Sequence, residues 1–288
     1  MKLASNSADG IIAELQSPEI FNPHRLQGWK EKIALGKSKA IEHINQEEAK
    51  LYWICETIVE SHLLFQDAFN KLKQGEYYKA WCELEQCELA IKSLEKHHAP
   101  SAGDPHHLLY LTDMVNRWQE LFPYSVFFSP EILKRIVVCS TCGAEVKPRF
   151  QCVHKKGEIY NGEMCTHIVT KCDLLSISVV ENPVQKYSVA FLSSKENGEP
   201  IDYYNYSNLK FIVDRLESPY HKWVHQVTQR KITRSEASHL MSNSKCPCLS
   251  GNSFGECCAS KDEFLVPHLQ IEFYVTPKPI LPTEELLF

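Results

Sequence analysis

Apolar side chains recur at helical spacing through the first third of the chain. Between residues 45 and 75 they fall three, four or seven positions apart, and Gly75 stands where such a helix ends. A second apolar stripe runs from about 76 to 96, with glutamates elsewhere on the surface of the same helix. The two segments predict an antiparallel helical hairpin. Because no second copy of the pattern follows, a helical bundle is favoured over a helical repeat.

Two further helices are predicted from their first residues. Asp104 followed by Pro105 is a typical helix start, with the aspartate as N-cap and the proline in the first turn. Ser129 followed by Pro130 repeats this signal, and it predicts a short helix that leads to Arg135. The whole segment before that point therefore predicts helices and no strand.

After residue 135 the pattern changes, because β-branched residues, glycine and cysteine replace the helical stripe. Residues 174–180 and 186–192 predict strands, and 208–216 predict one more helix. Residues 228–245 are polar and mildly basic, as in a linker. A last alternating stretch, "LQIEFYV" (269–275), predicts a strand near the end of the chain.

The predicted fold class is therefore α+β. We expect a helical domain over 1–135 and an α+β middle domain over 136–230. The remaining residues, 231–288, are predicted to hold a linker, a compact cysteine motif at 246–258 and the C-terminal strand.

Composition narrows the class of protein. The 288 residues are 43% hydrophobic and 23% charged, with a net charge of −5, which argues against a polycationic nucleic-acid coat. No apolar run approaches the roughly 20 residues of a membrane helix, and the first residues lack the apolar region of a signal peptide. The predicted location is the reducing cytoplasm. In that compartment clustered cysteines are expected to serve as metal ligands and not as disulfides, and the clusters are drawn from the twelve cysteines of the chain.

The first cysteine cluster begins with Cys139-x2-Cys142 followed by Gly143. Two thiolates at this spacing can hold one zinc ion, and the glycine permits the tight turn that aims backbone N–H groups at the sulfurs. A redox dithiol of the thioredoxin type is less consistent with the sequence, because a strand precedes the pair but no helix follows it.

A second pair of ligands must complete this site. Cys152 and His154 follow nine residues after the first pair, and Cys165 and His167 come later with the same internal spacing. We expect Cys152 and His154 to be the ligands because they close the more compact loop, with Cys165 and His167 as the alternative. Between the two pairs, 155–165 predict a tight hairpin that leads away from the site.

The second cluster holds four cysteines within thirteen residues. They are Cys246, Cys248, Cys257 and Cys258. A C-x-C pair and an adjacent C-C pair, joined by eight residues, can surround one ion. Ser250 and Gly251 supply a turn after the first pair, and Phe254 gives the loop an apolar side chain to pack. The sequence therefore predicts a second zinc ion, which would supply folding energy that so short a segment lacks.

This second stretch closely resembles the SEC-C motif, named for the C-terminal tail of the secretion ATPase SecA. The motif reads C-x-C-x-S-G-x-x-(aromatic)-x-x-C-(C or H), and every slot is filled here. Leu249 stands where glycine is usual, and thirty residues follow a motif that often ends its chain. The resemblance implies a zinc-binding module that contacts other proteins or the ribosome, without catalysis.

Residues of about 120–225 also resemble an uncharacterised bacterial group of proteins that carry this tail. The shared patterns are C-x2-C-G at 139–143, C-x-H-x2-G-E-I-Y-x-G-x-x-C over 152–165, and "NPVQKYSV" at 182–189. This likeness supports Cys152 and His154 as ligands. It implies an architecture and brings no activity.

Together these observations predict a non-catalytic zinc-binding adaptor with two zinc ions. Each cluster offers four protein ligands, and closed zinc sites are structural, whereas catalytic zinc keeps a position open for water. The expected partner is a protein or the ribosome, with no membrane, and the oligomeric state is left open.

Two alternatives belong to other classes. A hydrolase or protease-like middle domain would be an enzyme, and "LLSISVVENPVQK" resembles a stretch of phage prohead proteases. No serine, histidine and acid set accompanies it, and the HExxH and deaminase motifs of zinc enzymes are absent. A nucleic-acid-binding protein is the other alternative. It would use a cluster of basic and aromatic residues: His221, Lys222, Trp223, His225, Arg230, Lys231 and Arg234.

Overall fold

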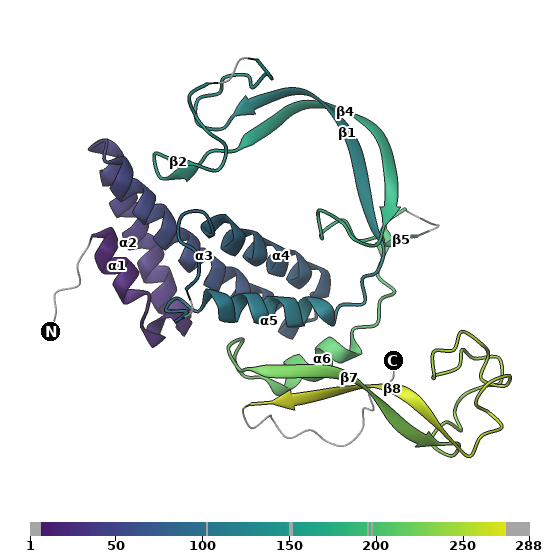
Figure 1. The fold of residues 1–288 in the computed structure, drawn as a ribbon. Coiled ribbons are helices and arrows are strands. Elements are labelled where there is room, and N and C mark those ends of the chain that lie inside the picture. The colour runs from purple at the N-terminus through teal and green to yellow at the C-terminus, as the bar shows by residue number, and fades with distance from the viewer. Residues whose placement is uncertain (1–6, 102, 150–151, 195, 197, 275–288) are drawn as a thin grey trace. The chain divides into compact units, whose positions relative to one another are not determined.

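The computed structural model describes residues 7–101, 103–149, 152–194, 196 and 198–274 (Figure 1). Helices and antiparallel strand pairs both occur in these ranges, so the predicted α+β class is confirmed. The chain divides into two compact units, Met1–Tyr206 and Ser207–Phe288, which are described separately. The predicted division into three domains stays a prediction. Within the described residues, no helix has the length and apolar character that a membrane crossing requires.

The first unit begins with a helical bundle. Its helices are α1 (Ala8–Glu14), η1 (Pro18–Phe21), α2 (Pro23–Glu42), α3 (Gln46–Gln74), α4 (Tyr77–Leu94) and α5 (Leu108–Glu120). Helices α3 and α4 pack against each other, which confirms the predicted hairpin. Gly75 ends α3 with a φ of 77°, a left-handed conformation that glycine adopts without steric cost. The core of the bundle holds large side chains such as Trp29, Phe65 and Trp118, each fully buried.

Helix α5 begins at Leu108 and not at Pro105, so its predicted start is wrong by three residues. The residues between take an irregular turn, with positive φ angles at Asp104 and His107. The capping role of the aspartate is nevertheless present, because its two carboxylate oxygens accept hydrogen bonds from the N–H groups of Leu109 and Tyr110, both at 3.0 Å.

A buried histidine ties this turn to the bundle. The Nε2 atom of His62, on α3, lies 2.9 Å from the carbonyl oxygen of His106. Since a carbonyl can only accept, the Nε2 atom carries the proton. Burial lowers the pKa of His62 to about 4, so the ring is neutral at pH 7.

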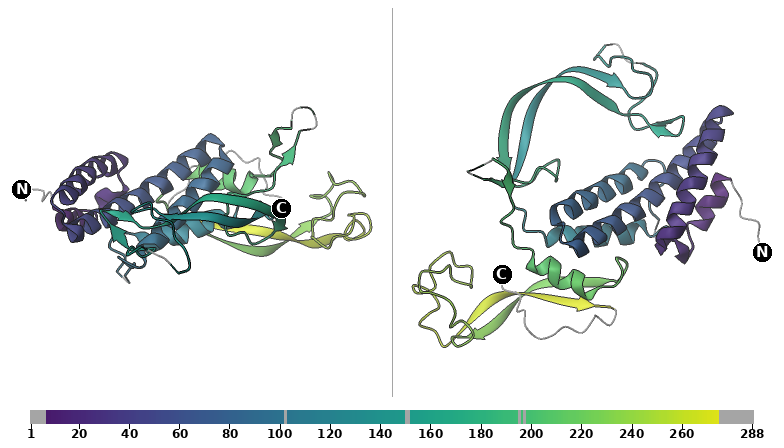
Figure 2. Two further views of the ribbon diagram at one scale, coloured as in Figure 1. Left: turned by 90° about the horizontal axis from the view of Figure 1, so that it is seen from above. Right: turned by 180° about the vertical axis from the view of Figure 1, so that it is seen from behind.

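A long two-stranded ribbon follows the bundle (Figure 2). It consists of β1 (Phe127–Cys139) and β4 (His167–Val180), paired antiparallel, so the predicted strand over 174–180 is confirmed. The helix predicted from Ser129 and Pro130 is wrong. The same residues are extended because they pair with Ser178 and Ile177 of β4. These partners lie nearly fifty positions later, so a local start signal cannot indicate them. A proline is tolerated in such a ribbon because both strands are edge strands.

The second predicted strand, over 186–192, is also wrong for most of its length. Only Leu192–Ser193 forms a strand, β5, which pairs with β6 (Pro200–Ile201). The backbone of Lys186 is instead bound by helix α4. Its carbonyl oxygen accepts from the indole of Trp81 at 2.6 Å, and its N–H donates to Glu85 at 2.6 Å. These side chains replace the strand partner that the segment would otherwise need.

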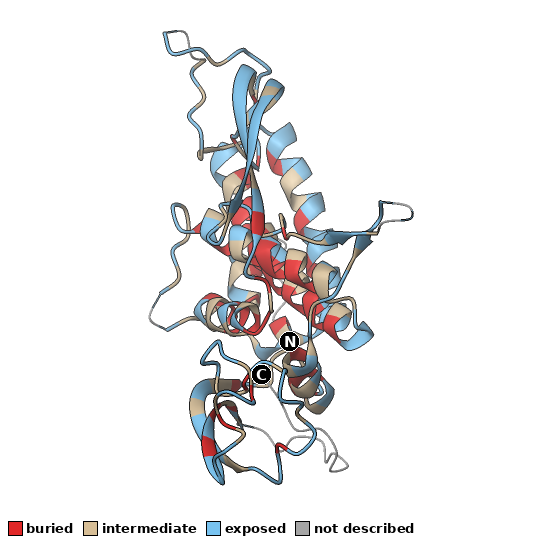
Figure 3. Ribbon diagram, turned by 90° about the vertical axis from the view of Figure 1, so that its right-hand side faces the viewer, coloured by how far each residue is buried: buried red, intermediate tan, exposed pale blue. Residues whose placement is uncertain are grey.

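The ribbon is tied to the bundle at both ends. At its base, Phe127 is buried and its ring lies 6.3 Å from that of Trp81. At its tip, a short hairpin made of β2 (Ile159–Tyr160) and β3 (Glu163–Met164) reaches α2 and α3. There the Lys37 ammonium lies 2.7 Å from the Glu163 carboxylate. Figure 3 shows that buried residues concentrate in the helices, whereas the ribbon is largely exposed.

Over residues 207–274, which the structure describes, the second unit contains one helix and a second ribbon. They are α6 (Ser207–Arg215), β7 (Trp223–Thr233) and β8 (Glu263–Phe273). The helix confirms the prediction for 208–216. The predicted linker is wrong for residues 228–233, which belong to β7 and pair with β8 without a register shift. The predicted strand over 269–275 is confirmed as far as Phe273, and Val275 lies outside the described residues.

Candidate metal centres

The first centre consists of Cys139, Cys142, Cys152 and His154. Strand β1 delivers Cys139 at its last position, and a tight turn then brings Cys142 back beside it. The turn is closed by the Gly143 N–H, which donates to the Cys139 carbonyl at 2.8 Å. Gly143 has a φ of 71°, so the glycine predicted for this turn is used for its left-handed conformation.

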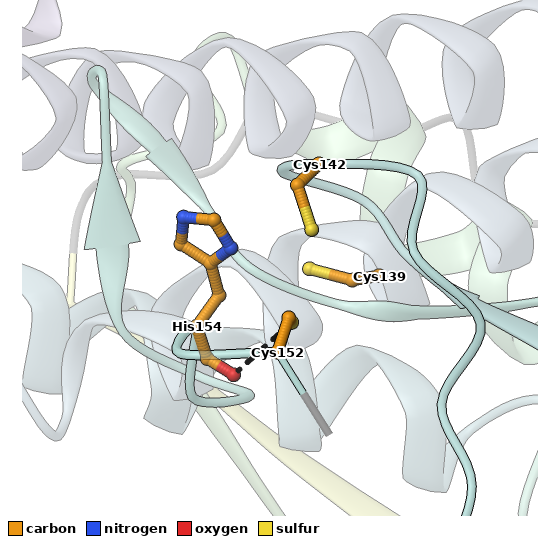
Figure 4. Close-up of side chains that lie close together, drawn as sticks. All are labelled: Cys139, Cys142, Cys152 and His154. Atoms are coloured by element: carbon orange, nitrogen blue, oxygen red, sulfur yellow. Dashed lines mark hydrogen bonds between the residues drawn. The ribbon is translucent and has the colours of Figure 1, made fainter. Parts of the chain in front are cut away.

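The four ligand atoms of the first centre all lie within 4.8 Å of one another. Figure 4 shows the sulfurs of Cys139 and Cys142 pointing toward each other, with the imidazole of His154 beside them. The Nδ1 atom of His154 is buried and, among the described residues, has no hydrogen-bond partner. A buried ring nitrogen without a partner is costly unless it binds an ion, so the residues present fit a metal at this position.

The sequence predicts that the hairpin over 155–165 leads away from the site, and this prediction is wrong. The β2–β3 hairpin packs against the first centre. The ring of Tyr160 meets that of His154 edge to face at 4.7 Å. The hydroxyl oxygen of Tyr160 accepts a hydrogen bond from the Lys155 N–H at 3.0 Å. The turn residues of the β2–β3 hairpin, Asn161 and Gly162, both have positive φ angles, which is typical of a hairpin with a two-residue turn. The hairpin therefore orients the histidine.

The two residues of the alternative ligand pair, Cys165 and His167, take different positions in the structure. The Sγ atom of Cys165 is buried 3.6 Å from that of Cys139, outside the group of four. His167 lies opposite Cys139 in the β1–β4 ladder and is likewise outside the group. From the sequence alone, Cys165 is only an alternative to Cys152 at one ligand position. The structure makes it a fourth thiol at the centre, in contact with Cys139.

The environment of Cys139 favours a thiolate. Burial pushes the pKa of this thiol up, but N–H groups of Cys142 and Thr141 and the neighbouring thiols of Cys165 and Cys152 pull it down to about 6. The thiolate is the form that binds a metal. The turn that positions the sulfur therefore also supplies the charge state needed for ligation.

The second centre consists of Cys246, Cys248, Cys257 and Cys258, whose ligand atoms also lie within 4.8 Å of one another. Neighbouring sulfurs are 3.2 Å apart for Cys246 and Cys248, and 3.5 Å apart for Cys248 and Cys257. The hydroxyl of Ser250 lies 3.3 Å from the sulfur of Cys257. The thirteen-residue motif thus brings all four of its cysteines to one point.

We call residues 246–258 the knuckle. Its backbone conformation explains why glycine is usual at the position that Leu249 occupies in the motif. Leu249 has a φ of 58°, in the left-handed region that glycine occupies without strain. Its N–H donates to the Cys246 carbonyl at 3.1 Å, so the conformation is part of the ligand turn. Gly251, two residues later, has a φ of 85° and keeps its expected glycine. The leucine therefore occupies a position at which a side chain costs stability.

A small hydrophobic core surrounds the second centre. It consists of Ala237, Cys246, Phe254, Cys258, Phe264 and Val266. The rings of Phe254 and Phe264 lie 5.9 Å apart, which joins the knuckle to strand β8. Two of the six core residues are themselves cysteines of the centre. The knuckle is therefore packed against the β7–β8 ribbon, in which it forms the connection.

Two thiols of the second centre, Cys248 and Cys258, differ in their acidity. Hydrogen bonds with Ser250 and with the Cys246 thiol lower the pKa of Cys248 to about 6. Burial raises the pKa of Cys258 to about 12. A buried thiol of this kind ionises only when a cation offsets the cost of burial. Binding of a divalent ion by all four sulfurs would therefore release protons.

Three of the residues predicted for nucleic-acid binding, Trp223, Arg230 and Lys231, make contacts within the second unit. Trp223 is fully buried, so its ring has no face for a base to stack on. The guanidinium of Arg230 lies 2.9 Å from Glu236, and the Lys231 ammonium lies 2.9 Å from Glu263. The structure thus brings these side chains into a folded ribbon, in which the aromatic residue belongs to the interior.

Both centres offer four sulfur or nitrogen donors, a set suited to zinc. The comparisons with known proteins add no relative, because the chain matches no family model, no curated protein and no solved structure. The assignment of metal-binding capacity therefore rests on the geometry of the two centres.

Proposed function

We propose that the chain is a non-catalytic adaptor that binds two zinc ions and a macromolecular partner, either a protein or the ribosome. The observation that carries this proposal is the number of donors, because each centre has four protein ligands gathered around one point. A zinc ion held by four protein ligands has no position left for water or substrate. Its role is then to stabilise the fold around it.

The partner surface that we assign is a groove beside the second centre, with a volume of about 320 Å³. Its apolar lining includes Ile232, Leu240 and Leu249, and Lys245 supplies positive charge. Arg230 also lines the groove, but its guanidinium is paired with Glu236, another lining residue, at 2.9 Å. Cys246 also lines it, so a zinc ion in the second centre would fix one wall of the groove. The resemblance of this knuckle to the SEC-C motif supports the same role, since that module contacts proteins or the ribosome.

The enzyme alternative receives no support from the described residues. Cys165 is the one additional thiol at the first centre, and it is fully buried. A nucleophile must reach its substrate, and a reactive cysteine is usually found in a partially exposed position. The geometry of the centre therefore favours a structural site.

Native mass spectrometry of the full chain, purified without chelator, tests the metal part of the proposal. We expect two zinc ions per chain, with one lost in Cys139→Ser and the other lost in Cys257→Ser. A chain that holds a single ion, or an ion bound with a displaceable water, would contradict the assignment of two closed sites.

Photo-crosslinking tests the partner part. A crosslinker placed at Leu249, in the groove, is expected to capture a defined partner from a bacterial lysate. The matched control is Leu265, an exposed leucine of β8 that is not among the residues lining the groove. Capture that survives nuclease treatment indicates a protein, and capture of intact ribosomal particles indicates the ribosome. Equal crosslinking from both positions, or no loss of crosslinking in Cys257→Ser, would contradict the groove as the partner site.

A further inference from the structure

The β1–β4 ribbon sorts its side chains into an apolar face and a polar face. Directly paired residues of an antiparallel ribbon share a face. Three consecutive pairs on one face are apolar, and we call this set the apolar face: Phe128 with Val179, Pro130 with Ile177, and Ile132 with Leu174. The pairs between them, on the other face, are polar: Ser129 with Ser178, and Glu131 with Ser176.

A β-bulge preserves this segregation. Strict alternation along β4 would place Leu174 on the same face as Ser176. The register shifts between Glu131 and Ile132, and Leu175 is the extra residue. The shift brings Leu174 opposite Ile132 and so extends the apolar face by one more pair. The bulge therefore acts to keep the aliphatic side chains together.

The apolar face is open to solvent. The exposed fractions of its five large side chains lie between 39% for Ile132 and 67% for Val179. A two-stranded ribbon is only marginally stable in water without cover on one face, and a contiguous apolar patch of this kind usually marks an interface. The ribbon therefore requires a second surface to pack on.

The helical bundle does not supply that surface. At the base of the ribbon it packs on Phe127, which by alternation points to the face opposite Phe128. Within the described residues, no helix packs along β1 or β4. The apolar face is thus turned away from the bundle at the base.

The charges that flank the apolar face are opposite in sign. Lys134 lies beyond Ile132, two positions further along β1 and therefore on the same face. Glu181 directly follows the last residue of β4, Val180, at the other end of the apolar face. Both residues are exposed. A surface that carries a cation at one end and an anion at the other is complementary to its own copy when the two run antiparallel.

We propose that the apolar face packs face to face, in an antiparallel arrangement, on the same face of a second copy of this chain. The two ribbons then form a four-stranded sandwich, with Lys134 of each copy opposite Glu181 of the other. Pro130 removes one backbone donor from the ribbon, which works against pairing through the strand edges. The face is two strands wide and roughly 20 Å long, at the low end of interface sizes, so the expected Kd of the dimer is micromolar.

Sedimentation equilibrium of the zinc-loaded full chain, from about 1 to 100 µM, tests this proposal. We expect a reversible monomer–dimer equilibrium that Ile177→Lys weakens by about 100-fold, because each dimer contains the substitution twice. The matched control is Ser178→Lys, which adds the same charge to the next residue but on the polar face. It is expected to leave the Kd within about threefold of the original.

A charge swap tests the antiparallel arrangement. Lys134→Glu alone and Glu181→Lys alone each place like charges opposite one another, and each is expected to weaken the dimer by about tenfold at low salt. The double variant exchanges the two ends and is expected to restore the original Kd, which also shows that the double variant folds.

Three results would overturn the proposal. The first is a chain that remains monomeric at about 100 µM, which would leave the apolar face to a different partner. The second is a dimer that Ser178→Lys disrupts as strongly as Ile177→Lys does. The third is a double charge variant that dimerises no better than the two single variants.

Discussion

The two metal centres differ in what surrounds them. The second centre is built into a hydrophobic core, and two of the six buried residues of that core, Cys246 and Cys258, are also its ligands. The first centre has a single fully buried ligand, Cys139, while Cys142 is exposed. Its support comes from the β2–β3 hairpin and from polar contacts with the helical bundle, such as the ion pair between Lys96 and Glu158 at 2.6 Å.

Two centres with four donors each can therefore contribute unequally to the stability of the structure around them. Loss of the ion from the second centre would leave buried thiols in a core too small to hold together without it. Loss of the ion from the first centre would free a surface loop at the end of a ribbon, while the large core of the bundle stays intact.

The largest effect is expected from Cys258→Ser. Structural zinc contributes an apparent free energy of about 10–16 kcal/mol at pH 7, so loss of this ligand should unfold the segment between β7 and β8. Hydrogen exchange should show lost protection around Phe254 and Phe264, with protection of α3 unchanged. The matched variant is Cys139→Ser, which should also lose one zinc ion but keep the protection of the second unit. Equal loss of protection in both variants would show that the two centres contribute equally to the stability of the structure around them.

A smaller effect, on zinc affinity, should distinguish the ligand His154 from the neighbouring thiol of Cys165 at the first centre. Removal of a ligand in His154→Ala should weaken zinc binding by well over 100-fold, whereas removal of a contacting thiol in Cys165→Ala should weaken it by about 10-fold. Competition with a chromophoric chelator measures both affinities. The opposite order of the two variants would identify Cys165 as the ligand and reassign the site.

Acid is expected to destabilise the helical bundle through His62. The pKa of this histidine is about 4 in the folded chain and 6.5 when exposed, so the unfolded chain binds the additional proton between these values. The stability contributed by the neutral ring is complete above pH 6.5 and is lost as the pH falls toward 4. The expected loss from this residue between pH 7 and pH 5 is about 2 kcal/mol.

Urea unfolding of the bundle, followed by far-ultraviolet circular dichroism at the two pH values, measures this loss. His62→Gln keeps a hydrogen-bond donor but cannot titrate, so its stability should vary less with pH by that amount. A variant with the same pH dependence as the original chain would show that His62 is not the group responsible.

The smallest effect is expected from Leu249→Gly. Replacing a side chain at a φ of 58° by glycine should stabilise the second unit by up to about 1 kcal/mol, since the left-handed conformation is then free of strain. Leu249→Ala is the control, because it shortens the side chain and keeps the strain. Thermal unfolding of the zinc-loaded chain measures both. A gain in the alanine variant equal to that in the glycine variant would attribute the effect to the leucine side chain and not to the backbone.

Much of the fold could be predicted from local signals. The apolar stripes of α3 and α4, the terminating Gly75 and the short helix α6 follow from spacing and propensity over a few residues. The prediction failed where a distant segment decided the conformation. Ser129 and Pro130 carry a helix start signal, yet they lie in β1 because β4 offers them a partner. The same is true of Lys186, whose backbone is bound by side chains of α4.

The candidate centres show the same limit at the level of side chains. The spacing within 246–258 was sufficient to predict four cysteines around one point, because all of them lie on one short turn. At the first centre, the sequence offered two C-x-H pairs of equal spacing. The structure gathers Cys152 and His154 with Cys139, and it also places Cys165 in contact, which no spacing rule indicates.

The sequence by itself determined the helical hairpin and the four donors of the second centre, because these depend on residues that are close together in the chain. Only the tertiary structure decided which faces are buried. It buried Trp223, and it left the apolar face of the β1–β4 ribbon open. The physical reason is that burial depends on what packs against a side chain, and in this protein those partners come from segments far away in the sequence.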